Sequence, residues 1–171
     1  FRLRISEGTD KKGTDVLLTA ADFEVVKLQP TADGVEALLK NKKHGLSVLV
    51  RYSAKAGERV MRKQLEITAE RPVTVERIDV DSLALADVYQ PYKLKAITAK
   101  ESRNWKPGLG QPLFTSKSAL FMGTECPASY NYVEGGNYYC GYLYGHALQP
   151  GQTLNTYSSV LGAGDDSAFI S

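Results

Sequence analysis

Side chains that bind metals or act as nucleophiles are scarce in this sequence. Its two histidines, His44 and His146, have no candidate partners near them, and its two cysteines lack the spacing of a zinc or thiol redox motif. Gly108 and Gly110 lack the third glycine and the helix of a phosphate-binding loop. We therefore expect no metal, no cofactor and no histidine-based catalytic group.

Long apolar runs and a strong net charge are missing too. A membrane-spanning helix needs about 18 consecutive apolar residues, and no such run occurs. No signal peptide is visible, and the sequence starts at Phe1 without Met, so we expect a processed or excised fragment. Lys and Arg total 21 against 19 Asp and Glu, and a net charge of +2 gives no field that would attract nucleic acid.

Period-2 alternation is the dominant pattern of the chain. Apolar residues alternate with polar ones in four segments: Val35–Leu39, Leu46–Tyr52, Met61–Ile67 and Val73–Val80. Lys63 interrupts the apolar side of the third segment, so we expect it at a sheet edge or rim. The fourth segment changes phase midway, which predicts a β-bulge.

Turn signals separate these segments at intervals of roughly 10 residues. They include Asp33-Gly34, which predicts a hairpin between Phe23–Leu28 and Val35–Leu39. No amphipathic helical pattern occurs. With 43% hydrophobic and 23% charged residues, the 171 residues predict one all-β domain, an antiparallel two-sheet β-sandwich with little or no helix.

Met61–Thr68 and Val73–Val80 are expected to pair as neighbouring strands. Charged side chains would then form ion pairs on their outer faces; these are Arg62, Glu66, Glu76 and Arg77.

Two features of the later part leave alternatives open. Cys126 and Cys140 either form a disulfide, which would imply an oxidising compartment, or remain buried thiols. Six tyrosines occur within fifteen residues, with one tryptophan upstream, and these rings are suited to stacking on sugars, to a domain interface or to ordinary packing. The group comprises Trp105, Tyr130, Tyr132, Tyr138, Tyr139, Tyr142 and Tyr144.

A series of short motifs carries a family resemblance. In order they are Arg62–Thr68, Thr74–Val80, Gly110–Phe114, Leu120–Ala128, Ala147–Thr153 and Ser159–Gly162. Together they resemble the N-terminal β-sandwich, or supersandwich, domain of α-galactosidase-like glycoside hydrolases, the melibiase group. The resemblance covers most of the chain.

The resemblance implies that the catalytic machinery lies elsewhere. In that family the sandwich precedes a (β/α)₈ barrel that holds the two catalytic carboxylates, and it packs on that barrel and sometimes shapes the sugar pocket. The chain ends at Ser171, about where a linker to such a barrel would begin. Glu125 is a lone carboxylate, whereas glycoside hydrolysis needs a pair of carboxyls. A catalytic role, a sugar or interface contact, and a structural role all remain open for it.

We therefore expect a non-catalytic sandwich domain of a glycoside hydrolase that supports a catalytic domain and borders its carbohydrate site. Two alternatives are a free-standing carbohydrate-binding module and an adhesion sandwich with no sugar role. The expected location is periplasmic or extracellular.

Overall fold

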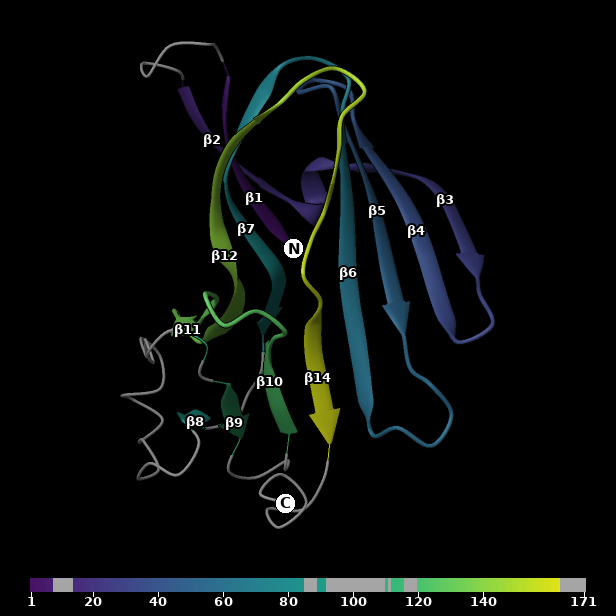
Figure 1. The fold of residues 1–171 in the computed structure, drawn as a ribbon, viewed down its shortest axis with the longest axis vertical. Coiled ribbons are helices and arrows are strands. Elements are labelled where there is room, and N and C mark those ends of the chain that lie inside the picture. The colour runs from purple at the N-terminus through teal and green to yellow at the C-terminus, as the bar shows by residue number, and fades with distance from the viewer. Residues whose placement is uncertain (8–13, 85–88, 92–109, 111, 116–119, 164–171) are drawn as a thin grey trace.

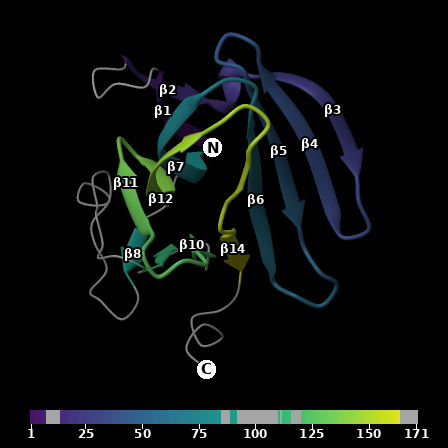
Figure 2. The same ribbon diagram turned by 45° about the horizontal axis from the view of Figure 1, so that its top comes forward.

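The computed structural model describes residues 1–7, 14–84, 89–91, 110, 112–115 and 120–163. These residues form two antiparallel sheets that face each other, which confirms the predicted all-β sandwich. Figures 1 and 2 show β3, β4 and β5 of the larger sheet extending past the smaller one. In this part of the chain the helical structure is one short 3-10 turn, η1 (Ala20–Asp22).

The smaller sheet has five strands. In spatial order they are β11 (Tyr130–Glu134), β12 (Asn137–Leu148), β7 (Val73–Ala84), β1 (Arg2–Glu7) and β2 (Thr14–Thr19). β7 has the predicted bulge, because Arg4 lies opposite Arg77 whereas Ile5 lies opposite Val75.

The larger sheet has nine strands. Eight follow one another as β3 (Glu24–Pro30), β4 (Gly34–Asn41), β5 (Leu46–Ser53), β6 (Val60–Ala69), β14 (Ser159–Ala163), β10 (Leu120–Thr124), β9 (Leu113–Thr115) and β8 (Tyr89–Pro91). The ninth, β13 (Thr153–Asn155), pairs with β6 beyond the end of β14. The predicted hairpin at Asp33-Gly34 is confirmed, since Pro30 lies opposite Val35.

The core lies between the sheets and is built from the alternating apolar residues. Leu3 and Val75 come from the smaller sheet, and Val48, Leu65 and Ile67 come from the larger one; all five are inaccessible to solvent. Truncating such a side chain to Ala costs about 2–5 kcal/mol of stability.

The expected pairing of Met61–Thr68 with Val73–Val80 is wrong. β6 belongs to the nine-stranded sheet and β7 to the five-stranded one, so the chain crosses between layers after Ala69. The four charged side chains therefore have other partners. Arg62 pairs with Glu58 and Glu125, Glu66 with Arg51, Glu76 with Ser6, and Arg77 with Asp79.

Lys63 does not lie at a rim as expected. Its side chain is 5% exposed, and its Nζ donates to Oδ1 of Asp81, on the opposite sheet, at 2.8 Å. Ser159 donates from its hydroxyl to the other oxygen of the same carboxylate. Burial alone would lower the pKa of Lys63, but the attraction of Asp81 raises it overall, so this lysine stays charged inside the sandwich.

Candidate functional site

The tyrosine group is divided between the two faces of the smaller sheet. Tyr138 and Tyr142 point into the core, and the phenol of Tyr138 donates to Asn131 at 3.0 Å. Tyr144 is partly buried against the same core. The other three, Tyr130, Tyr132 and Tyr139, lie on the outer face. Tyr130 binds a carboxylate there, and the other two contact an arginine that is paired with the same carboxylate.

That carboxylate belongs to Asp79, which is 1% exposed although it points away from the core. Arg2 and Arg77 pair with it through their Nε atoms at 2.7 and 3.0 Å, and Tyr130 donates to it at 2.7 Å. Arg2 also donates to the hydroxyl of Tyr132 at 2.6 Å. Burial, followed by the charge of Asp79, raises the pKa of Tyr130 well above its usual value.

The ring faces of these outer tyrosines contact other protein groups. The rings of Tyr132 and Tyr139 stack at 5.0 Å, and the Arg2 guanidinium lies 3.5 Å from the centre of Tyr139. The Arg77 guanidinium lies 4.7 Å from the centre of Tyr130. Such cation–π contacts stabilise the cluster. The roles of these tyrosines in sugar or interface contact remain predictions.

The two cysteines are free and buried in the structure, so the thiol alternative is the one it contains. Cys140 lies in a small core cluster with Met122, Val133 and Tyr138. Burial, the largest cause, raises the pKa of the Cys140 thiol to about 11. A thiol with that pKa is unreactive at neutral pH.

Glu125 lies beside a cavity on the outer face of the nine-stranded sheet. The cavity measures about 610 Å³ and lies over β10, β14 and the start of β6. Phe114 and Phe121 line its apolar part, with ring centres 6.4 Å apart. Glu125 and Arg62 line its polar part.

Both carboxylates nearest to Arg62 are bound to its guanidinium. Glu125 accepts from Arg62 Nε at 3.1 Å and Glu58 accepts from Nη1 at 2.6 Å. Among the described residues, Glu125 is the one acid that lines the cavity. This arrangement differs from the two opposed carboxyls, about 5–10 Å apart, that flank the bond broken by a glycosidase.

The sequence analysis missed Phe114, Phe121 and Arg62 as members of this site. Both phenylalanines stand in motifs that carry the family resemblance, but nothing in the sequence showed that they meet Arg62 of β6. One glycine gave the available signal, because Gly162 leaves room for the Phe121 ring. Trp105 lies outside the described residues.

The part of the chain that the structure describes has neither a side-chain group suited to a metal ion nor a helix suited to crossing a membrane. No group of three His, Cys, Asp or Glu side chains is placed to hold a metal ion. None of the helical structure there is long and apolar enough to cross a membrane.

No protein-family model and no curated protein matches this sequence. Solved structures do match. A GH36 α-galactosidase, AgaA, from Geobacillus stearothermophilus aligns with a TM-score of 0.64 and 13% identity over 95% of this chain. The galactosidase domain of an α-galactosidase–sucrose kinase aligns with a TM-score of 0.67 and 12% identity over 94%. A polysaccharide lyase aligns with a TM-score of 0.54 and 15% identity over 96%.

The chain spans only about 30% of the length of those galactosidases and 26% of the lyase. At such low identities the likeness establishes the fold alone. The fold is that of a β-sandwich segment found within α-galactosidases, so the resemblance noted in the motifs is confirmed at the level of the fold.

Proposed function

We propose that this chain is a non-catalytic β-sandwich domain of a glycoside hydrolase. It supports a catalytic domain in the same polypeptide and borders the carbohydrate site of that domain. One observation carries the proposal: nearly the whole chain aligns with less than a third of each galactosidase. The remaining two thirds of those proteins have no counterpart in these 171 residues.

The cavity beside Glu125 supports the non-catalytic part of the proposal. General acid–base catalysis of glycoside transfer requires one protonated and one ionised carboxyl on either side of the scissile bond. Glu125 and Glu58 are instead both bound to the guanidinium of Arg62.

The test compares the product of the complete gene with a form that lacks residues 1–171. The complete product should hydrolyse an aryl α-galactoside. The shortened form should lose activity faster on heating, because the surface that packs on this domain is then exposed. A gene that encodes no further domain, or a complete product inactive on all aryl glycosides, would overturn the proposal.

A free-standing carbohydrate-binding module is the second candidate function. The polysaccharide lyase favours it in one respect, because this sandwich fold then occurs in carbohydrate-active proteins of more than one reaction type. This alternative requires a gene that ends close to residue 171, together with saccharide binding by the chain itself. Location in the periplasm or outside the cell is part of both proposals.

A further inference from the structure

Two hollows lie next to each other on the outer face of the nine-stranded sheet and share Arg62. The first is the cavity of about 610 Å³ beside Glu125. The second measures about 330 Å³ and is lined by Glu36, Arg51 and Gln64 of the three strands β4, β5 and β6. Arg62 lines both, so the two hollows adjoin at this side chain, and together they are called here the β6 groove. Its lining runs from β9 to β4, five strand spacings or about 24 Å.

The first hollow offers an apolar floor. The Phe114 and Phe121 rings are tilted by 35° to each other. A Cβ atom at Gly162 would overlap the Phe121 ring, so this glycine allows the ring to lie close to the backbone of β14. The aromatic surface therefore lies low in the groove. Aromatic floors of this kind stack on the apolar C–H faces of sugar rings.

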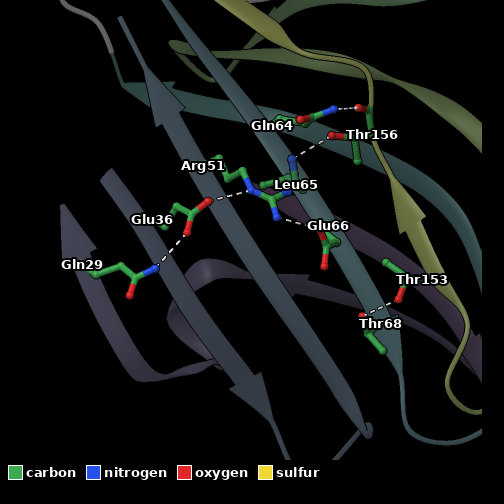
Figure 3. A network of polar contacts seen from close by, with 9 residues as sticks. All are labelled: Gln29, Glu36, Arg51, Gln64, Leu65, Glu66, Thr68, Thr153 and Thr156. Atoms are coloured by element: carbon green, nitrogen blue, oxygen red, sulfur yellow. Dashed lines mark hydrogen bonds and ion pairs between the residues drawn. The ribbon is translucent and has the colours of Figure 1, made fainter. Parts of the chain in front are cut away.

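The second hollow offers a fixed row of planar polar groups (Figure 3). Gln29 Nε2 donates to Glu36 Oε2 at 3.0 Å, and Arg51 Nε donates to Glu36 Oε1 at 2.8 Å. Arg51 Nη2 donates to Glu66 at 2.8 Å. Gln64 is anchored as well, since its Nε2 donates to the Thr156 carbonyl at 2.8 Å. Such anchoring lowers the entropy that the side chains lose when a ligand binds.

Charge in the β6 groove does not favour an anionic ligand. Arg51 is held between Glu36 and Glu66, and Arg62 between Glu58 and Glu125. Each of these two guanidinium groups therefore has two carboxylates, which would repel a phosphate or a uronate. The linings also include Arg59 in the first hollow and Asp33 in the second, which add one charge of each sign. What remains is a surface rich in hydrogen-bonding groups and without excess positive charge, next to an aromatic floor.

We infer that the β6 groove binds an uncharged oligosaccharide. One sugar ring lies on Phe114 and Phe121, with its hydroxyls at Arg62 and Glu125, and the next units extend over Arg51 and Gln64. This inference deepens the proposed function, on which it rests for the class of ligand. It places the saccharide contacts on the opposite sheet from the outer tyrosines.

The test is titration calorimetry of the 171-residue chain with stachyose, mannotetraose and, as the anionic probe, tetragalacturonate. A neutral tetrasaccharide should bind with a dissociation constant at or below about 1 mM, and the anionic one at least tenfold more weakly. Phe121→Ala and Glu125→Gln should each weaken neutral binding tenfold or more. Leu143→Ala is the matched control, because Leu143 is 75% exposed on the other sheet, and it should leave binding unchanged.

Several outcomes overturn the inference. The first is that neither neutral probe binds at roughly 20 mM. The second is that the anionic probe binds as tightly as the neutral ones. The third is that Tyr139→Ala abolishes binding of the neutral probes whereas Phe121→Ala does not. Should Phe121→Ala fail to fold, Glu125→Gln decides alone, because it keeps the shape of the side chain. If Phe121→Ala and Glu125→Gln instead separate this domain from the catalytic one in the complete protein, the groove is a domain contact and the inference fails. Galactosidase activity of the complete protein reports on the proposed function separately.

Discussion

Lys63 Nζ and Asp81 Oδ1 lie 2.8 Å apart in the interior, where they join the two sheets of the sandwich. Both side chains are less than 10% exposed. Asp79, only two residues before Asp81, binds Arg2 and Arg77 on the outer face instead. The two carboxylates can face opposite sides of the sheet because the strand register shifts near Val80. Cys140 lies opposite Asp81, whereas the next residue, Gly141, lies opposite Asp79.

The first prediction concerns this buried pair. Lys63→Met leaves Asp81 charged and without its partner, so the free energy of unfolding should fall by about 3–5 kcal/mol in urea titration. The double variant Lys63→Met/Asp81→Leu should recover most of the loss, because neither charge is then buried. Lys40→Met breaks an exposed pair with Glu70 and should cost less than about 1 kcal/mol. Equal losses in the two lysine variants would contradict the burial argument.

The second prediction concerns Gly141 of β12, which lies opposite β7 at the register shift near Val80. A Cβ atom at Gly141 would lie 2.7 Å from the Cα of Asp79 and closer still to the Ile78 carbonyl, and backbone atoms cannot move aside. We expect Gly141→Ala to destabilise the protein by about 1–3 kcal/mol or more, measured by thermal unfolding. At Gly123 a Cβ would lie 3.3 Å from a Pro112 side-chain atom, so Gly123→Ala should cost clearly less.

The third prediction follows from the Cys140 thiol, whose pKa burial raises to about 11. The unfolded chain ionises this thiol near pH 8.5, whereas the folded chain keeps it neutral until about pH 11. Because the unfolded state loses its proton first, stability should fall as pH rises from about 8.5 to 10. Cys140→Ala should flatten this part of the pH–stability curve, and an unchanged slope in the variant would show that another group is responsible.

The fourth prediction concerns two tyrosines, Tyr142 in the core and Tyr130 on the outer face of the smaller sheet. Burial raises the pKa of Tyr142 to about 12 and that of Tyr130 further, so these phenols should stay neutral at pH 11 in the folded protein. Ultraviolet difference titration should show incomplete ionisation at pH 11 and full ionisation in denaturant. Tyr130→Phe should remove one of the late-titrating groups. Complete ionisation of the native protein at that pH would contradict the cluster around Asp79.

Sequence alternation predicted strands and faces well, because it reports which side chains are buried. Val48 and Leu65 lie in the core, as their pattern indicates. Alternation does not report which strands are neighbours, so the pairing expected for β6 and β7 was wrong. Lys63 was misplaced for a related reason: its partner, Asp81, stands on the other sheet.

The candidate site was only partly predictable. Glu125 was singled out as a lone carboxylate and does line a cavity. Its partner Arg62 is 63 residues away in the sequence, and the contact depends on β14 lying between β6 and β10. Long-range sheet order of this kind leaves no local trace in the sequence, and the β6 groove could not be foreseen for that reason.

The most direct test of the central claim is hydrolysis of aryl α-galactosides by the purified 171-residue chain between pH 4 and 8. The claim is that the chain provides a folded sandwich but no catalytic pair of acids. It predicts release of nitrophenol at the rate seen in buffer alone. Turnover above that rate that is abolished by Glu125→Gln would contradict it.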